Sequence, residues 1–167
     1  MANTYTLIEA KTLTTTTASV TFSSIPQTYT DLLLKTSLRY TGTNADSVKM
    51  LFNNSASNYT AKWLEGSGAS TSSGSQFFQG IWIDTVGSST NASTFSNAET
   101  YIPNYAGSNY KSASTDLVTE NNATTAYMDI VAGLWSDTSA ITSLVISPLT
   151  YSFSSGSTFY LYGIKNS

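Results

Sequence analysis

The ten residues from position 31 to position 40 read DLLLKTSLRY, and they decide the fold class of this chain. The two faces of this stretch differ in polarity, with Leu32, Leu34, Leu38 and Tyr40 on one side and Lys35, Ser37 and Arg39 on the other. Side chains alternate between the two faces of a β-strand with a period of two. The stretch therefore predicts a strand with one buried face.

The same alternation recurs along most of the chain. It predicts shorter strands around Val20, Met50 and Ala61, and longer ones over Tyr5–Leu13, Phe77–Val86, Phe95–Ile102, Lys111–Thr119, Ala126–Trp135, Ile141–Ser147 and Thr158–Ile164. No segment has the 3.6-residue period of an amphipathic helix. Many short strands separated by turn residues indicate an all-β fold, which we interpret as an antiparallel β-sandwich of the jelly-roll type.

The alternation also predicts which side chains form the core and where the chain is irregular. The predicted core residues are Val20, Phe22, Leu32, Leu34, Leu38, Met50, Phe52 and Ile130. The stretch from Gly66 to Ser75 reads GSGASTSSGS and is predicted to be a flexible loop tip, because serine and glycine favour solvated connections.

A length of 167 residues fits a single domain. Residues 1–17 end in the run LTTTT and lack the strict alternation of the later strands, so we interpret them as an N-terminal arm or an edge strand. Residues 18–167 are predicted to form one β-sandwich domain.

The composition argues against most enzyme classes. The chain contains 28 Ser and 27 Thr but no His and no Cys, so it lacks the usual acid–base group, the commonest metal ligand and the thiolate nucleophile. We therefore predict a protein without enzymatic activity, cofactor or metal. Glycoside hydrolysis by two carboxylates is the alternative. Glu99, Asp116 and Asp129 lie in candidate strands, where we interpret them as solvent-facing residues.

The charge pattern excludes two classes of partner. Only 10% of the residues are charged, the net charge is −3, and the seven Lys and Arg are spread singly along the chain. No basic stripe exists that could follow a phosphate backbone, so no nucleic-acid binding is predicted. No stretch has the length of a bilayer span and no signal-peptide pattern begins the chain, so no membrane association is predicted.

The aromatic residues are the best candidates for a contact surface. The tryptophans could form a sugar-stacking platform or, as we favour, fill the core or a subunit contact. Tyr160 and Tyr162 lie opposite Phe159 and Leu161 on the last predicted strand, so one pair is predicted to be core and the other to meet a neighbour. The candidate interface residues are Tyr5, Leu7, Trp63, Trp82, Tyr105, Trp135, Tyr160 and Tyr162.

Four strings resemble a module of virion structural proteins from tailed bacteriophages, including phages of cyanobacteria and other aquatic bacteria. They are VTFSSIPQTYTDLLLKTSLR (20–39), YIPNYAG (101–107), VTENNATTAYMDIVAGLWSDTSAITSLVISP (118–148) and STFYLYGIK (157–165). Together they cover most of the chain outside the first 17 residues and the loops. The resemblance implies a structural role and brings no catalytic residues with it.

Within that class, the chain has its own Met1 and ends directly after the last predicted strand, which favours a free-standing component. It is similar in size and polarity to capsid cement or decoration proteins. This predicts that it binds the major capsid protein on the outer capsid surface of the virion, after assembly in the host cytoplasm, and forms a homotrimer. The alternative is a neck, tail or head-fibre adhesin that binds host-surface glycans.

Overall fold

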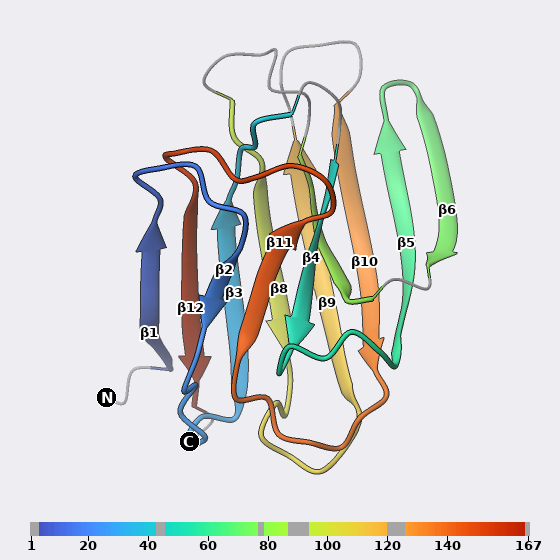
Figure 1. The fold of residues 1–167 in the computed structure, drawn as a ribbon. Coiled ribbons are helices and arrows are strands. Elements are labelled where there is room, and N and C mark those ends of the chain that lie inside the picture. Colours follow the sequence, from blue (N-terminus) through green and yellow to red (C-terminus); the bar gives the residue numbers. More distant parts are fainter. Residues whose placement is uncertain (1–3, 43–45, 77–78, 87–93, 120–125, 166–167) are drawn as a thin grey trace.

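The computed structural model of the chain describes residues 4–42, 46–76, 79–86, 94–119 and 126–165 (Figure 1). Within these ranges the chain forms strands and no helix. The strands are β1 (Tyr5–Thr12), β2 (Val20–Phe22), β3 (Asp31–Ser37), β4 (Asp46–Phe52), β5 (Tyr59–Ser67), β6 (Ser70–Gln76), β7 (Ile81–Val86), β8 (Asn97–Ile102), β9 (Lys111–Thr119), β10 (Tyr127–Trp135), β11 (Leu144–Pro148) and β12 (Thr158–Ile164). The predicted strand start at Phe77 and the first three residues of the chain lie outside the described residues.

The strands form two antiparallel sheets that pack face to face. The large sheet has the order β1-β12-β3-β8-β9-β10-β5-β6, and the small sheet has the order β2-β11-β4-β7. In Figure 1 the small sheet lies in front of the middle of the large one. The predicted all-β sandwich is confirmed, whereas this strand order does not confirm the jelly-roll pattern.

The hydrophobic core fills the space between the two sheets. Seven of the eight predicted core residues are buried there: Val20, Phe22, Leu32, Leu34, Leu38, Met50 and Phe52. An aromatic cluster anchors one end of the core, since the Trp135 ring lies 5.6 Å from the Phe52 ring and 6.0 Å from the Tyr59 ring. Such ring pairs add about 0.5–1.5 kcal/mol each beyond the area that they bury.

The prediction that Ile130 belongs to the core is wrong, because its side chain is 58% exposed. Both faces of β10 carry apolar residues, so its sequence does not show which face is buried. Packing against the small sheet decides it: Gly133 faces inward, where a Cβ atom would lie only 2.6 Å from Ile81. Val131 therefore faces the core, and Ile130 points to the other side of the sheet.

The prediction of a loop tip over Gly66–Ser75 is also wrong. The chain there forms a β5–β6 hairpin with a two-residue turn at Gly68 and Ala69, and Gly68 adopts a positive φ of 56° that glycine tolerates best. β6 consists mostly of serine and glycine, which have low strand propensity. Two contacts compensate for the low strand propensity of β6. Its main chain pairs with β5, and the ring of Trp63 packs closely over Gly74.

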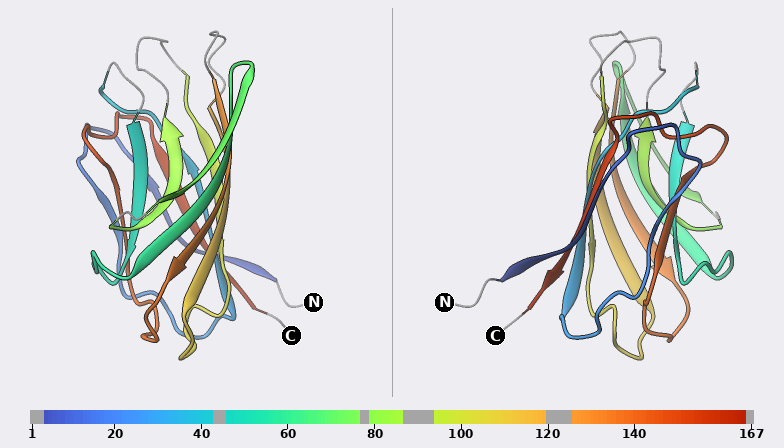
Figure 2. Two further views of the ribbon diagram at one scale, coloured as in Figure 1. Left: turned by 90° about the vertical axis from the view of Figure 1, so that its right-hand side faces the viewer. Right: turned by 60° about the vertical axis from the view of Figure 1, so that its left-hand side comes forward.

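The two ends of the chain meet at one edge of the large sheet. β1 is the outermost strand and pairs with β12, and Thr17 forms an isolated bridge with Phe153. Figure 2 shows β1 and the end of β12 extending beyond the small sheet. The side chains of residues 4–7 are accordingly exposed on both faces.

The orientation of β10 predicts losses of stability of different size for two neighbouring substitutions. Val131→Ala should lower the free energy of unfolding by about 2 kcal/mol, because it leaves a cavity between the sheets. Ile130→Ala removes an exposed side chain and should cost less than about 1 kcal/mol. Denaturant unfolding of both variants measures these losses. A larger loss for Ile130→Ala would mean that Ile130, and not Val131, faces the core.

Buried tyrosines predict an alkaline limit to stability. Burial raises the pKa of Tyr40 and of Tyr59 well above the ordinary value of 10.0, although Tyr59 Oη accepts a 2.7 Å hydrogen bond from the Phe52 amide. The folded state keeps these protons longer than the unfolded state, so the stability that they contribute is complete below about pH 10 and is lost as the pH rises further. Thermal unfolding followed from pH 8 to pH 11.5 should show this fall, and stability that is constant across the range would contradict it.

Candidate functional site

The outer face of the large sheet, defined as the face turned away from the small sheet, carries most of the exposed apolar side chains. Of nine large apolar residues that are exposed within the described ranges, seven lie on it: Tyr5, Leu7, Leu64, Tyr101, Val118, Met128 and Ile130. A concentration of exposed apolar side chains on one face is typical of binding surfaces in soluble proteins. The outer face is therefore the candidate functional surface.

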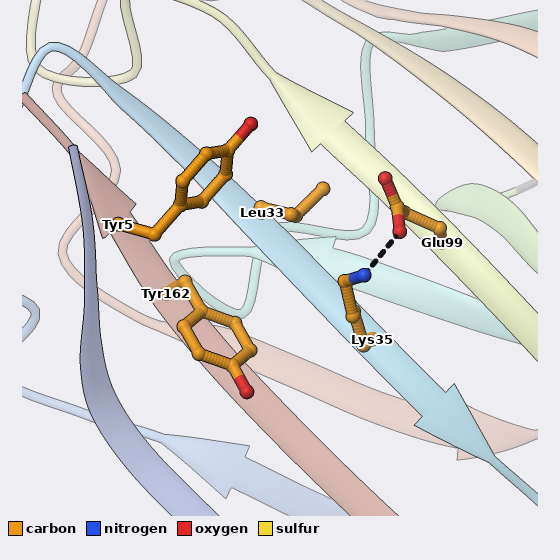
Figure 3. A pocket seen from close by; sticks show the side chains of 5 residues that line it. All are labelled: Tyr5, Leu33, Lys35, Glu99 and Tyr162. Carbon is orange, nitrogen blue, oxygen red and sulfur yellow. Dashed lines mark ion pairs between the residues drawn. The ribbon is translucent and has the colours of Figure 1, made fainter. Parts of the chain in front are cut away.

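One half of the outer face contains an open pocket, which we call the tyrosine pocket. It is lined by Tyr5, Leu33, Lys35, Glu99 and Tyr162 and has a volume of about 300 Å³ (Figure 3). Figure 3 shows the two tyrosine rings on one side and the Lys35–Glu99 pair on the other, with Leu33 between them. The pocket thus has an aromatic wall, an apolar floor and a polar wall.

Strand register explains why these five residues meet. Leu33 and Lys35 are two residues apart on β3 and so point to the same face. Tyr162 on β12 pairs with Leu33 from one side, and Glu99 on β8 pairs with Lys35 from the other. β1 brings Tyr5 to the edge of the pocket. The pocket is therefore built across four neighbouring strands.

The polar wall is an ion pair that faces solvent. Lys35 Nζ lies 2.7 Å from Glu99 Oε2, and the two side chains are 51% and 44% exposed. The hydrogen bond to Glu99 raises the pKa of Lys35, and the charge of that carboxylate adds to the effect. An exposed pair of this kind contributes at most about 1 kcal/mol to stability, so the fold does not depend on it and both groups can be shared with a ligand.

A second polar contact fixes the neighbouring aromatic side chain. Tyr101 Oη donates a 2.8 Å hydrogen bond to Asp31 Oδ2, and the Asn104 amide donates a 2.9 Å bond to Asp31 Oδ1. The bond to Asp31 raises the pKa of Tyr101. Tyr101 pairs across the sheet with Leu33, so Asp31 holds the ring of Tyr101 next to the floor of the pocket.

The other half of the outer face carries four exposed apolar residues, Leu64, Val118, Met128 and Ile130, which we call the aliphatic patch. Val118 of β9 is directly opposite Met128 of β10, and Ile130 of β10 is directly opposite Leu64 of β5. Each of the four is between 43% and 60% exposed. Cross-strand neighbours lie about 5 Å apart, so these side chains form one continuous apolar surface.

The structure brings together four of the eight predicted interface residues. Tyr5, Leu7, Tyr160 and Tyr162 share the outer face of β1 and β12, and Phe159 and Leu161 are fully buried on the other side, as predicted for that strand.

The prediction of an interface contact is wrong for three residues, because they are at most 6% exposed: Trp82, Tyr105 and Trp135. Trp82 Nε1 donates to the Asp84 carbonyl at 2.7 Å, and Tyr105 Oη donates to the Pro26 carbonyl. These bonds satisfy the polar end of each ring inside the protein. Trp63 is partly buried and packs edge-on against Trp82, with the ring centres 6.0 Å apart. For Trp82 and Trp135, the interpretation as core residues is the correct one.

Most of the site was not predicted from the sequence. Neither the group Leu33, Lys35, Glu99 and Tyr101 nor the four residues of the aliphatic patch stand out together in the local pattern. For Leu33 and Lys35 a signal was present, because they occupy the polar face of the alternating stretch 31–40. Their partners on β8 and β12 are distant in the chain and could be found only from the strand order.

The three carboxylates considered for catalysis do not share one site. Glu99 and Asp116 are cross-strand partners on the outer face, and Glu99 is paired with Lys35. The interpretation of Asp129 as solvent-facing is wrong, because it lies on the inward face of β10 with Val131 and is only 1% exposed. In the described part of the chain, no three carboxylates lie close enough together to hold a metal ion.

Comparison of the chain with protein-family models, with curated proteins and with solved structures gave no match. No helix in the described ranges has the length and hydrophobicity of a transmembrane span.

The Lys35–Glu99 pair gives a direct test of the geometry of the pocket. Glu99→Gln removes the main cause of the raised Lys35 pKa, so that pKa should return toward its ordinary value of 10.5. NMR titration of the lysine side-chain resonances measures the change. The free energy of unfolding should change by less than about 1 kcal/mol, because the pair is exposed. An unchanged Lys35 pKa in the variant would show that the pair does not form in solution.

Proposed function

We propose that the chain is a non-enzymatic virion structural protein, a capsid cement or decoration protein that binds the assembled shell of major capsid protein. The observation that supports this best is the aliphatic patch, because four half-exposed aliphatic side chains next to one another on three neighbouring strands suit an apolar protein surface. The resemblance of four sequence strings to tailed-phage virion proteins supports the choice of partner.

The size of the patch bears on how the protein binds. Complete burial of one such side chain contributes about 1.5–3 kcal/mol, so four half-exposed ones contribute a few kcal/mol. Association of two proteins costs about 4–15 kcal/mol in lost freedom of motion. One patch alone is therefore a weak contact. A homotrimer, as the sequence analysis predicts, would present the patch three times and bind by multivalency.

The mechanism is mass action. A protein that binds only the assembled shell stabilises that shell relative to its separated subunits. The low charge of the chain fits contacts that form after the shell is complete, because such contacts need shape and apolar area more than long-range attraction. The alternative function, a neck, tail or head-fibre adhesin, would place the same domain at few positions on the particle.

Charge placed in the patch should prevent binding to the shell. Ile130→Glu and Met128→Glu bury a carboxylate in an apolar contact and should reduce binding to purified particles that lack this protein at least about tenfold. Co-sedimentation followed by quantitative mass spectrometry measures bound copies. Thr21→Glu, which places the same charge at an exposed position of the small sheet, is the matched control and should bind normally.

Two results would contradict the proposal. Equal binding of Ile130→Glu and Thr21→Glu would exclude the aliphatic patch as the contact. A count of about a dozen copies or fewer in mature particles, instead of hundreds, would favour the adhesin.

A further inference from the structure

We propose that the tyrosine pocket is a saccharide-binding subsite that takes one neutral hexopyranose unit. This activity goes beyond shell binding, because the pocket and the aliphatic patch share no residue. The lining of the pocket selects a ligand ring that has an apolar C–H face, a rim of hydroxyl groups and no net charge.

The aromatic wall suits the apolar face of a sugar ring. Tyr5 is 57% exposed and Tyr162 is partly exposed, so both rings are open to a ligand. In Figure 3 they stand side by side along the same side of the pocket. Aromatic side chains provide a large, rigid contact area at low entropic cost. Leu33 is only 5% exposed and closes the floor of the pocket.

The polar wall suits the hydroxyl groups. Lys35 can donate hydrogen bonds and Glu99 can accept them, whereas each sugar hydroxyl does both. Two adjacent hydroxyls of one sugar can therefore bind one to Lys35 and the other to Glu99, which lie 2.7 Å apart. The pair has no net charge, so the pocket should prefer a neutral sugar. A uronic acid would meet repulsion from Glu99 as well as attraction to Lys35.

The size of the pocket limits both the ligand and its affinity. A volume of about 300 Å³ is at the lower end of the range for small-molecule sites, about 300–1,000 Å³. One sugar unit fits this space. An open site that holds a single unit binds weakly, with a Kd of about 1 mM or more. Several copies on one particle would bind a polysaccharide much more tightly.

The twist of the large sheet lets the pocket stay open when the patch is covered. Adjacent strands rotate by about 20–25°. Four to five strand steps separate the aromatic wall on β12 from β10 and β5, while Glu99 on β8 and Val118 on β9 stand on neighbouring strands. Figure 2 shows β12 and β5 strongly inclined to each other. The aromatic wall on β12 and the part of the aliphatic patch on β10 and β5 therefore point in different directions, so a protein bound over β10 and β5 leaves the tyrosine rings accessible.

The proposal is tested by NMR titration of the full chain with methyl glycosides of glucose, galactose and mannose, each to tens of millimolar. At least one should shift backbone resonances of β1, β3, β8 and β12 and leave those of β5 and β10 unchanged. Tyr5→Ala and Tyr162→Ala should each weaken binding about tenfold, and Lys35→Met should weaken it as well. Tyr110→Ala is the matched control, because Tyr110 is 57% exposed outside the pocket. This variant should bind like the unmodified chain.

The spectra of the variants also report whether the fold is intact, so loss of binding and loss of structure are distinguished. No shift with any of the three glycosides would overturn the proposal, and so would equal binding by Tyr5→Ala and Tyr110→Ala. Tighter binding of methyl glucuronate would refute the preference for a neutral sugar. If Tyr162→Ala abolished binding to particles while no sugar bound, the pocket would be a protein contact and the proposal would be wrong.

Discussion

Strand β3 holds the large sheet together, because it is hydrogen-bonded to β12 on one side and to β8 on the other. β1 and β12 come from the two ends of the chain, while β8, β9, β10, β5 and β6 come from its middle. Without β3 these two groups would have no common sheet. The seven residues Asp31–Ser37 therefore join the strands from the two ends of the chain to the strands from its middle.

The same strand links stability to function. On its inner face Leu32 and Leu34 are at most 1% exposed, and they fix the backbone of β3 in the core. On its outer face Leu33 and Lys35 line the tyrosine pocket. Because side chains on a strand alternate, the packing on one face positions the groups on the other. A site placed on such a strand keeps its shape without a ligand.

Local alternation was enough to predict most of the fold. The bounds Lys111–Thr119 and Thr158–Ile164 agree with β9 and β12, since turn-forming residues precede each strand, Gly107–Asn109 before β9 and Gly156 before β12. Prediction failed where tertiary packing overrides local sequence. β10 is apolar on both faces, so the burial of Val131 instead of Ile130 depends on the small sheet, and β6 is a strand because β5 pairs with it. The tyrosine pocket joins four strands whose order the local pattern does not contain.

The pairing of β1 with β12 has a mechanical consequence. Tyr5 at the start of β1 lies opposite Ile164 at the end of β12, and the Lys165 amide donates a 3.1 Å bond to the Thr4 carbonyl. Because the two strands are antiparallel, a force that pulls Thr4 and Lys165 apart acts on the first of these bonds alone. The edge of the sheet would then open one bond at a time, like a zipper, and resist little tension. Load applied through the sheet faces is instead shared by the whole core, so the domain is suited to resist compression more than stretching.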